Sequence, residues 1–189
     1  MRNPFLKVAV CLFVLLTLII STVSAASLEG KKRELRQKTL VTLDKLYQKQ
    51  PSARSAIKNS AGYAVFNNTG FKLGVIGGAH GRGMAVNNQS GQEVFMKMKE
   101  FQAGLGLGIK EYALIFVFAS QDAWESFVDN GWEFGGQATA AVKDGVNGDS
   151  MQGAISVTPE IWMYQMTTKG LALELAVKGT KYYKDSDFY

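Results

Sequence analysis

Few residues in this chain of 189 could do acid–base, nucleophilic or metal chemistry. His80 is the single histidine, and Cys11 is the single cysteine. Histidine-based catalysis or a metal site would have to be built around His80, and no pair of acidic residues has a spacing suited to acid–base work. The sequence therefore predicts a non-enzymatic protein with no catalytic residue, metal or cofactor. His80 beside Arg82 could bind a phosphate group; the alternative is an ordinary residue at a strand edge.

Glycine-rich segments are the second place where chemistry could reside. Residues 77–83 read Gly-Gly-Ala-His-Gly-Arg-Gly, but a phosphate-binding loop needs a helix after it, and here residues 84–88 continue as strand and turn. Gly104, Gly106 and Gly108 alternate with leucine, which predicts close packing of one strand face against a neighbour. The acidic run at residues 144–149 lacks the full loop of an EF-hand and is expected to be a solvated turn.

The N-terminus has the order of a secretory signal peptide. Arg2 and Lys7 precede an apolar run at residues 8–20, and Val-Ser-Ala at residues 23–25 resembles a cleavage site. The run is short for a membrane-spanning helix, which needs about 20 residues, although an uncleaved anchor is the alternative. We expect a signal peptide at residues 1–25 and an exported protein, periplasmic or extracellular, that could lie peripherally on a membrane. Its mature part would contain no cysteine.

Positive charge is concentrated directly after this segment. Residues 26–50 hold seven basic and three acidic side chains, whereas residues 51–189 hold 12 basic and 13 acidic ones. Leucines at three- and four-residue spacing predict a helix over residues 28–50 with lysines along one flank. Such a helix could lie on an anionic membrane; the alternative is that its leucines pack on the protein and its lysines are solvated. The candidate lipid contacts are Lys31, Lys32, Arg36, Lys38 and Lys45, with Arg82 as a weaker candidate.

The rest of the chain is dominated by glycine-punctuated β sequence. A short helix is expected at residues 52–59 with Ser52 as N-cap, and another at residues 121–129 capped by Ser120. Strands are expected at residues 62–67, 71–78, 81–87, 93–101, 103–110, 112–119, 133–142, 154–157, 161–168 and 171–177, with a fraying strand in the tail from residue 178. We therefore predict a mainly-β α+β fold, a glycine-rich antiparallel sheet curled into a sandwich or partial barrel, with N-terminal helices and one inserted helix.

Several segments together resemble the SYLF domain. They are Ala-Gly-Tyr-Ala-Val-Phe at residues 61–66, the glycine-rich residues 77–83, Leu-Ile-Phe-Val-Phe at 114–118 followed by Trp-Glu-Ser-Phe at 124–127, Trp-Glu-Phe-Gly-Gly at 132–136, and the stretch from Tyr164 to Gly170-Leu171. His80 stands where a tyrosine is commoner in the family. The resemblance covers about two-thirds of the chain and implies a SYLF-type domain at residues 52–189, after the basic helix at residues 26–51.

The resemblance implies lipid binding. Eukaryotic family members bind phosphoinositides and some bind actin, often beside an SH3 or FYVE domain, which this sequence lacks. An exported bacterial protein would meet neither phosphoinositides nor actin, so the transferable function is binding to anionic phospholipid. Nucleic acid is not an expected partner, because the basic segment lacks interleaved aromatic residues. The rival hypotheses are a cell-envelope adaptor that binds a protein partner and, less favoured, a hydrolase.

Overall fold

A computed structural model describes residues 4–134, 151–167, 170–172 and 179–189. The chain forms two compact units, residues 1–34 and 35–189, each considered by itself. The first unit contains helical residues of α1 (Pro4–Lys49), whose last turns, from Leu35, belong to the second unit. Among the described residues, no helix is both long enough and apolar enough to cross a bilayer. From residue 135 onward, the predicted strand at residues 133–142 lies outside the described residues. The acidic run at residues 144–149 lies wholly outside them.

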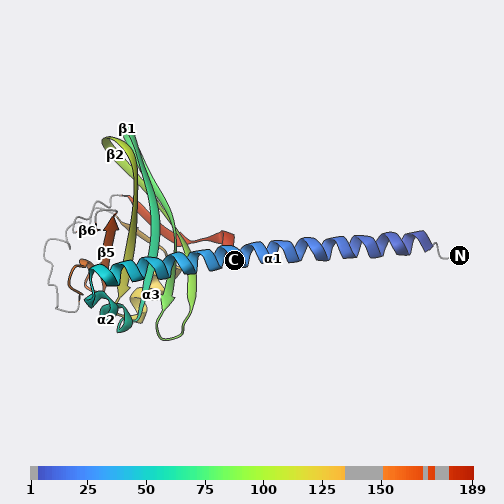
Figure 1. Cartoon of the computed structure of the whole chain (residues 1–189), viewed down its shortest axis with the longest axis horizontal. Coiled ribbons are helices and arrows are strands. Elements are labelled where there is room, and N and C mark those ends of the chain that lie inside the picture. The colour runs from blue at the N-terminus through green and yellow to red at the C-terminus, as the bar shows by residue number, and fades with distance from the viewer. Residues whose placement is uncertain (1–3, 135–150, 168–169, 173–178) are drawn as a thin grey trace. The chain divides into compact units, whose positions relative to one another are not determined.

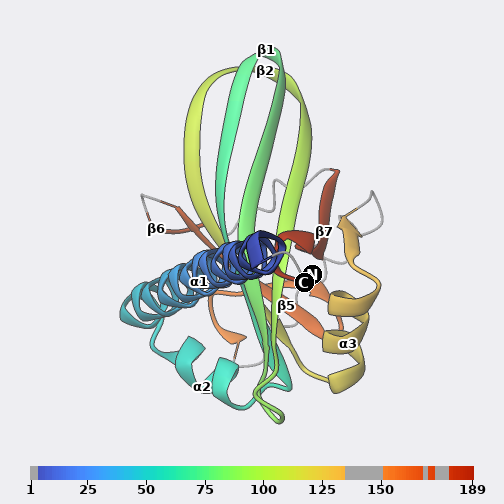
Figure 2. The same cartoon turned by 90° about the vertical axis from the view of Figure 1, so that its right-hand side faces the viewer.

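The second unit is built on one antiparallel sheet with the order β3-β7-β2-β5-β4, in which β1 also pairs with β2 and β6 with β5 (Figures 1 and 2). This curled, half-barrel sheet confirms the predicted mainly-β α+β fold. Its helices are α2 (Ser52–Lys58) and α3 (Gln121–Asp129), with a short 3-10 turn, η3, at Ser186–Phe188. Its strands are β1 (Gly62–Asn87), β2 (Glu93–Phe118), β3 (Trp132–Phe134), β4 (Ile155–Thr158), β5 (Ile161–Thr167), β6 (Gly170–Ala172) and β7 (Thr180–Lys184).

Strict alternation along β1 and β2 divides the apolar residues between two cores. Phe66, Phe116 and Phe118 pack inside the curl of the sheet with α3, whose Trp124, Phe127 and Val128 are buried as predicted. The intervening residues, such as Val65 and Ile115, face the other way and pack against Leu43 and Leu46 of α1 and Ile57 of α2. Because successive side chains of a strand point to opposite faces, both faces of this part of the sheet are buried.

The N-cap of α3 and the turn between β1 and β2 were correctly predicted from local sequence signals. The Ser120 hydroxyl accepts a hydrogen bond from the Ala123 amide at 3.2 Å, which satisfies one free donor at the start of α3. The Asn87 side chain accepts from the amides of Gln89 and Ser90, and Gly91 has φ +71°. At α2 the prediction was wrong: Pro51 occupies the N-cap position, and Ser52 is the first helical residue.

Two predictions about strands were wrong. The six short strands expected between residues 62 and 119 are two continuous strands of 26 residues each, because the glycines bend the ribbon without interrupting its pairing. The strand expected in the tail from residue 178 is confirmed as β7, but its expected fraying is wrong, because β7 lies between β2 and β3. It is held there because Tyr182 is buried in the aromatic core, with its ring centroid 4.9 Å from that of Phe66.

Tyr164 of β5 makes the fold sensitive to alkaline pH. Its ring is fully buried in the core beneath α1 and α2, and burial raises the pKa of its phenol to about 12 from 10.0. The folded protein therefore retains a proton that the unfolded chain releases, so stability is lost as pH rises from about 10 to about 12. We expect a loss of roughly 2–3 kcal/mol. Urea denaturation at neutral and alkaline pH should show a smaller loss in Tyr164→Phe; an equal loss in both proteins would contradict the assignment.

Candidate lipid-binding surface

The predicted basic residues of α1 lie in different surroundings. In the first unit, Lys31 is exposed and Lys32 forms an ion pair with Glu29, at 3.3 Å. In the second unit, Arg36 Nε donates a hydrogen bond to Glu93 Oε2 at 2.7 Å, and its guanidinium lies 5.6 Å from the centre of the Phe95 ring. Arg36 therefore ties α1 to β2, and its charge is already partly compensated by a carboxylate.

Lys38 and Lys45 lie together at one groove. They are seven residues apart, nearly two helical turns, and therefore occupy the same side of α1. The groove has a volume of about 520 Å³ and lies between this side of α1 and segments of β1, β2 and β5. Its remaining lining residues are Gln37, Val41, Thr42, Asn67, Asn68, Thr69, Glu111, Tyr112, Ala113, Met166 and Thr167. Glu111 is the single acidic residue among them, so the groove carries a net positive charge.

Two neighbouring asparagines of β1 line this groove, and only the first turns its side chain toward α1. Asn67 Oδ1 accepts a hydrogen bond from the Thr42 hydroxyl at 2.9 Å, which fixes α1 against β1. Asn68 is 3% exposed, and neither its side-chain oxygen nor its nitrogen has a hydrogen-bond partner among the described residues. Because Asn68 follows Asn67 on the strand, its side chain points to the opposite face of the sheet from α1, where a Cβ added at Gly81 would overlap its Oδ1. Sequence reasoning did not select Asn67, which only the fold brings next to α1.

A second hollow of about 270 Å³ lies on the opposite face of the sheet, and Tyr112 is among the residues that line both. Lys72 and Lys110 line it, together with Glu100 and Gln165. The Tyr112 hydroxyl donates a hydrogen bond to Glu100 Oε2 at 2.8 Å, and burial, followed by the nearby Glu100 carboxylate, raises the pKa of Tyr112. Lys72 and Lys110 are thus further cations that sequence reasoning did not select. The signal available in the sequence was that Lys72 directly precedes the uncharged residues 73–79 and Lys110 directly follows the uncharged residues 101–109.

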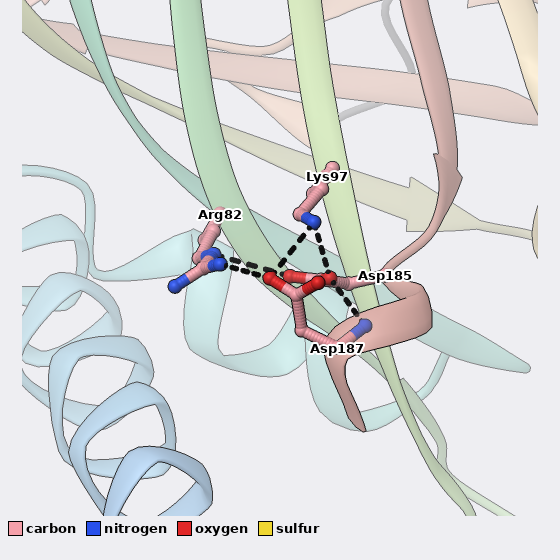
Figure 3. Close-up of polar contacts among 4 residues, drawn as sticks. All are labelled: Arg82, Lys97, Asp185 and Asp187. Carbon is pink, nitrogen blue, oxygen red and sulfur yellow. Dashed lines mark hydrogen bonds and ion pairs between the residues drawn. The ribbon is translucent and has the colours of Figure 1, made fainter. Parts of the chain in front are cut away.

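Arg82, the weaker candidate, lies in an ion-pair cluster (Figure 3). Its Nε is 3.1 Å from Asp185 Oδ2, and its Nη2 donates to Asp187 Oδ2 at 2.5 Å. Lys97 Nζ contacts the same two carboxylates at 2.7 and 3.0 Å, and these hydrogen bonds raise the pKa of Lys97. The cluster links β1 and β2 to the C-terminal turn, so Arg82 has a structural role, and the arrangement does not bring it to the groove of Lys38 and Lys45.

His80 is exposed on β1, where it pairs in register with Lys99. Within the described ranges, no group of three or more His, Cys, Asp or Glu side chains could hold a metal ion. The two lysines that the fold gathers at the groove are suited to binding an anion through charge and hydrogen bonds. This arrangement has the chemistry of a binding site.

Residues 99–188 match the family model Ysc84, described as Las17-binding protein actin regulator. With the curled sheet and the motifs at residues 114–118 and 164–171, this match places them in the Ysc84, or SYLF, family of binding domains and confirms the resemblance. The chain is also similar to Beta cell expansion factor A of Aeromonas veronii, with 35% identity over 147 residues. The alignment covers 77% of this chain and 54% of that protein, so the chain spans about half the length of this relative.

Proposed function

We propose that this protein binds anionic phospholipid, and that the basic part of α1 makes the contact. The observation that carries the proposal is the groove in which Lys38 and Lys45 lie beside the apolar side chains of Val41 and Met166. The lysines would neutralise a lipid phosphate, and the apolar residues would contact the adjoining acyl chain. Membership of the SYLF family supports lipid as the ligand class.

The same proposal gives the other predicted residues graded roles. Lys31 and Lys32 would add long-range attraction to a negative surface, whereas Arg36 would mainly hold the helix in place through Glu93. Arg82 would contribute least, because Asp185 and Asp187 offset its charge. No step of this function requires catalysis, a metal or a cofactor.

We further propose that the protein is exported, with residues 1–25 as its signal peptide and a peripheral position on a membrane. The order of Arg2, Lys7 and the apolar run at residues 8–20 supports this. The family model's description names Las17 binding and actin regulation; for this chain, actin would be a partner only by analogy. A cell-envelope protein partner is the competing proposal, and it predicts no affinity for vesicles.

The double variant Lys38→Glu/Lys45→Glu tests where the contact lies. Each basic residue near an anionic surface contributes about 1 kcal/mol, so losing both should weaken binding at least ~30-fold. The measurement is flotation with phosphatidylcholine vesicles containing phosphatidylglycerol. A control of equal net charge is Lys58→Glu/Lys181→Glu, which alters exposed lysines outside the groove. Equal losses in the two variants would show that overall charge, and not the groove, determines binding.

A further inference from the structure

The paired strands β1 and β2 form an arch, defined here as residues 71–78 and 101–109. Figures 1 and 2 show both strands rising together, turning over and returning to the body of the second unit. Leu73 pairs with Leu107 and Ile76 with Ala103, and the register shifts between Gly74 and Ile76. Gly74 has φ +65°, a backbone conformation that residues with a Cβ atom disfavour. Glycine and the register shift thus let the two-stranded ribbon bend at this point.

The arch exposes apolar side chains. Of the ten strongly exposed large apolar side chains among the described residues, seven lie on it, and Leu107 and Ile109 are 84% and 80% exposed. The seven are Phe71, Leu73, Val75, Ile76, Phe101, Leu107 and Ile109. Monomeric proteins rarely expose a contiguous apolar surface of this kind unless it binds something.

Charged side chains are absent from the arch beyond Lys72, and the first charged residue after it on the second strand is Lys110. Residues 73–79 and 101–109 contain no charged side chain and no histidine. Phe71 pairs with Ile109 and Leu73 with Leu107, so these four lie on one face of the ribbon. Lys72 and Lys110 lie on the opposite face, where each is opposite a glycine. The result is an uncharged apolar ribbon with one lysine on each strand at its base.

We infer that the arch inserts shallowly into the apolar region of a lipid bilayer, with Lys72 and Lys110 at the level of the phosphates. This inference rests on the proposed function for its class of partner, but it assigns a second contact surface. Lysine suits this position because its stem can lie along apolar material while its ammonium group reaches the headgroups. The two lysines also match the negative charge of the lipids that the groove is proposed to bind.

The form of the arch favours a fluid partner over a protein. Its apolar side chains project from a narrow ribbon, and a Cβ added at Gly74 or Gly108 would meet no atom within 4 Å. A protein interface would need a complementary surface of several hundred square ångströms on each side, whereas lipid chains adapt to projecting side chains. In the described sheet β1 pairs with β2 alone, so the other edge of β1 keeps unpaired backbone groups. Such groups are costly in the apolar interior of a bilayer, which limits insertion of the arch to a shallow depth.

The arch and the basic groove lie close enough to contact the same membrane. Thr69 and Glu111 line the groove and pair with each other. The first arch pair, Phe71 and Ile109, lies two residues further along the same strands, about 7 Å away. A bilayer that takes up the arch would therefore have its headgroups near the groove.

A fluorescent label at position 107 tests the insertion. In the full chain with Cys11→Ser, the variant Leu107→Cys would carry an environment-sensitive nitrobenzoxadiazole label, and Gln89→Cys at the β1–β2 turn would be the matched control. Both positions are exposed. With phosphatidylcholine–phosphatidylglycerol vesicles we expect a blue shift, a several-fold rise in emission and quenching by chain-brominated lipids at position 107 only. Bound protein in which position 107 is neither shifted nor quenched would overturn the inference and leave the proposed function standing.

Two further variants separate the outcomes. If the label at position 107 is still quenched after Lys38→Glu/Lys45→Glu with undiminished binding, the arch inserts and the groove proposal fails. The variant Leu73→Ser/Leu107→Ser/Ile109→Ser should weaken vesicle binding at least tenfold at high salt, where the lysines are screened. Undiminished binding by that variant would overturn the inference. So would light scattering that shows a dimer of the original chain and a monomer of the triple variant, because the arch would then bind a second copy.

Discussion

Asp185→Ala should lower the free energy of unfolding by about 3–5 kcal/mol, the loss typical of breaking a buried ion pair from one side. Asp185 is completely buried, and its carboxylate contacts both Arg82 and Lys97 (Figure 3). The same carboxylate accepts a hydrogen bond from the Asp187 amide at 3.0 Å, which caps η3. Alanine would leave Arg82 and Lys97 with only the exposed Asp187 carboxylate and would remove the cap of η3.

Asp187→Ala is the matched control for this prediction. Asp187 contacts the same two cations, but its side chain is 46% exposed, and exposed ion pairs contribute about 0–1 kcal/mol. Urea denaturation of the two variants should therefore separate a large loss from a small one. Equal losses would mean that Asp185 acts only through local charge and that its burial is unimportant.

Gly83→Ala should cost about 3 kcal/mol, at the upper end for overpacking. A Cβ on Gly83 would overlap the carbonyl oxygen of Val65 and would lie 2.5 Å from Cδ1 of the Phe66 ring. Residues 65 and 83 belong to the two halves of β1, and each half is held in register by β2. Neither half can move away without breaking its pairing with β2, so the sheet would have to open where the two halves of β1 approach each other.

Gly70→Ala provides the comparison on the same strand. The nearest atoms to a Cβ at Gly70 lie at 3.6 Å, an ordinary contact distance, and Gly70 does not have a positive φ. We expect Gly70→Ala to change the free energy of unfolding by less than about 0.5 kcal/mol. Thermal and urea denaturation can measure both variants; a tolerated Gly83→Ala would show that the two halves of β1 are further apart than described.

The fold was predictable wherever one local pattern determined the outcome. The Ser120 cap, the buried face of α3 and the Asn87 turn depend on residues close in sequence, and all were predicted correctly. Continuity of β1 and β2 was not predictable by the same means, because glycine usually marks a turn. Here Gly81 and Gly83 are needed for close approach of two strand halves, which is a property of the folded sheet.

The candidate site was predictable in part. The seven-residue spacing of Lys38 and Lys45 placed them on one side of a helix, and the fold adds the groove beside them. Asn67 could not have been selected, because its hydrogen bond with Thr42 of α1 depends on a contact distant in sequence. The alternating glycines at residues 104–108 were expected to pack against a neighbour; at Gly108 this was wrong, because a Cβ there would have open space around it.

Binding of the full chain to neutral and anionic vesicles, at low and high salt, tests the central claim most directly. Co-sedimentation with phosphatidylcholine alone and with added phosphatidylglycerol would measure both affinities. We predict tighter binding to the anionic vesicles and a preference that shrinks as salt increases, because the lysines of α1 recognise surface charge. Equal affinity for both kinds of vesicle at low salt, or binding to neither, would contradict recognition of anionic phospholipid by this protein.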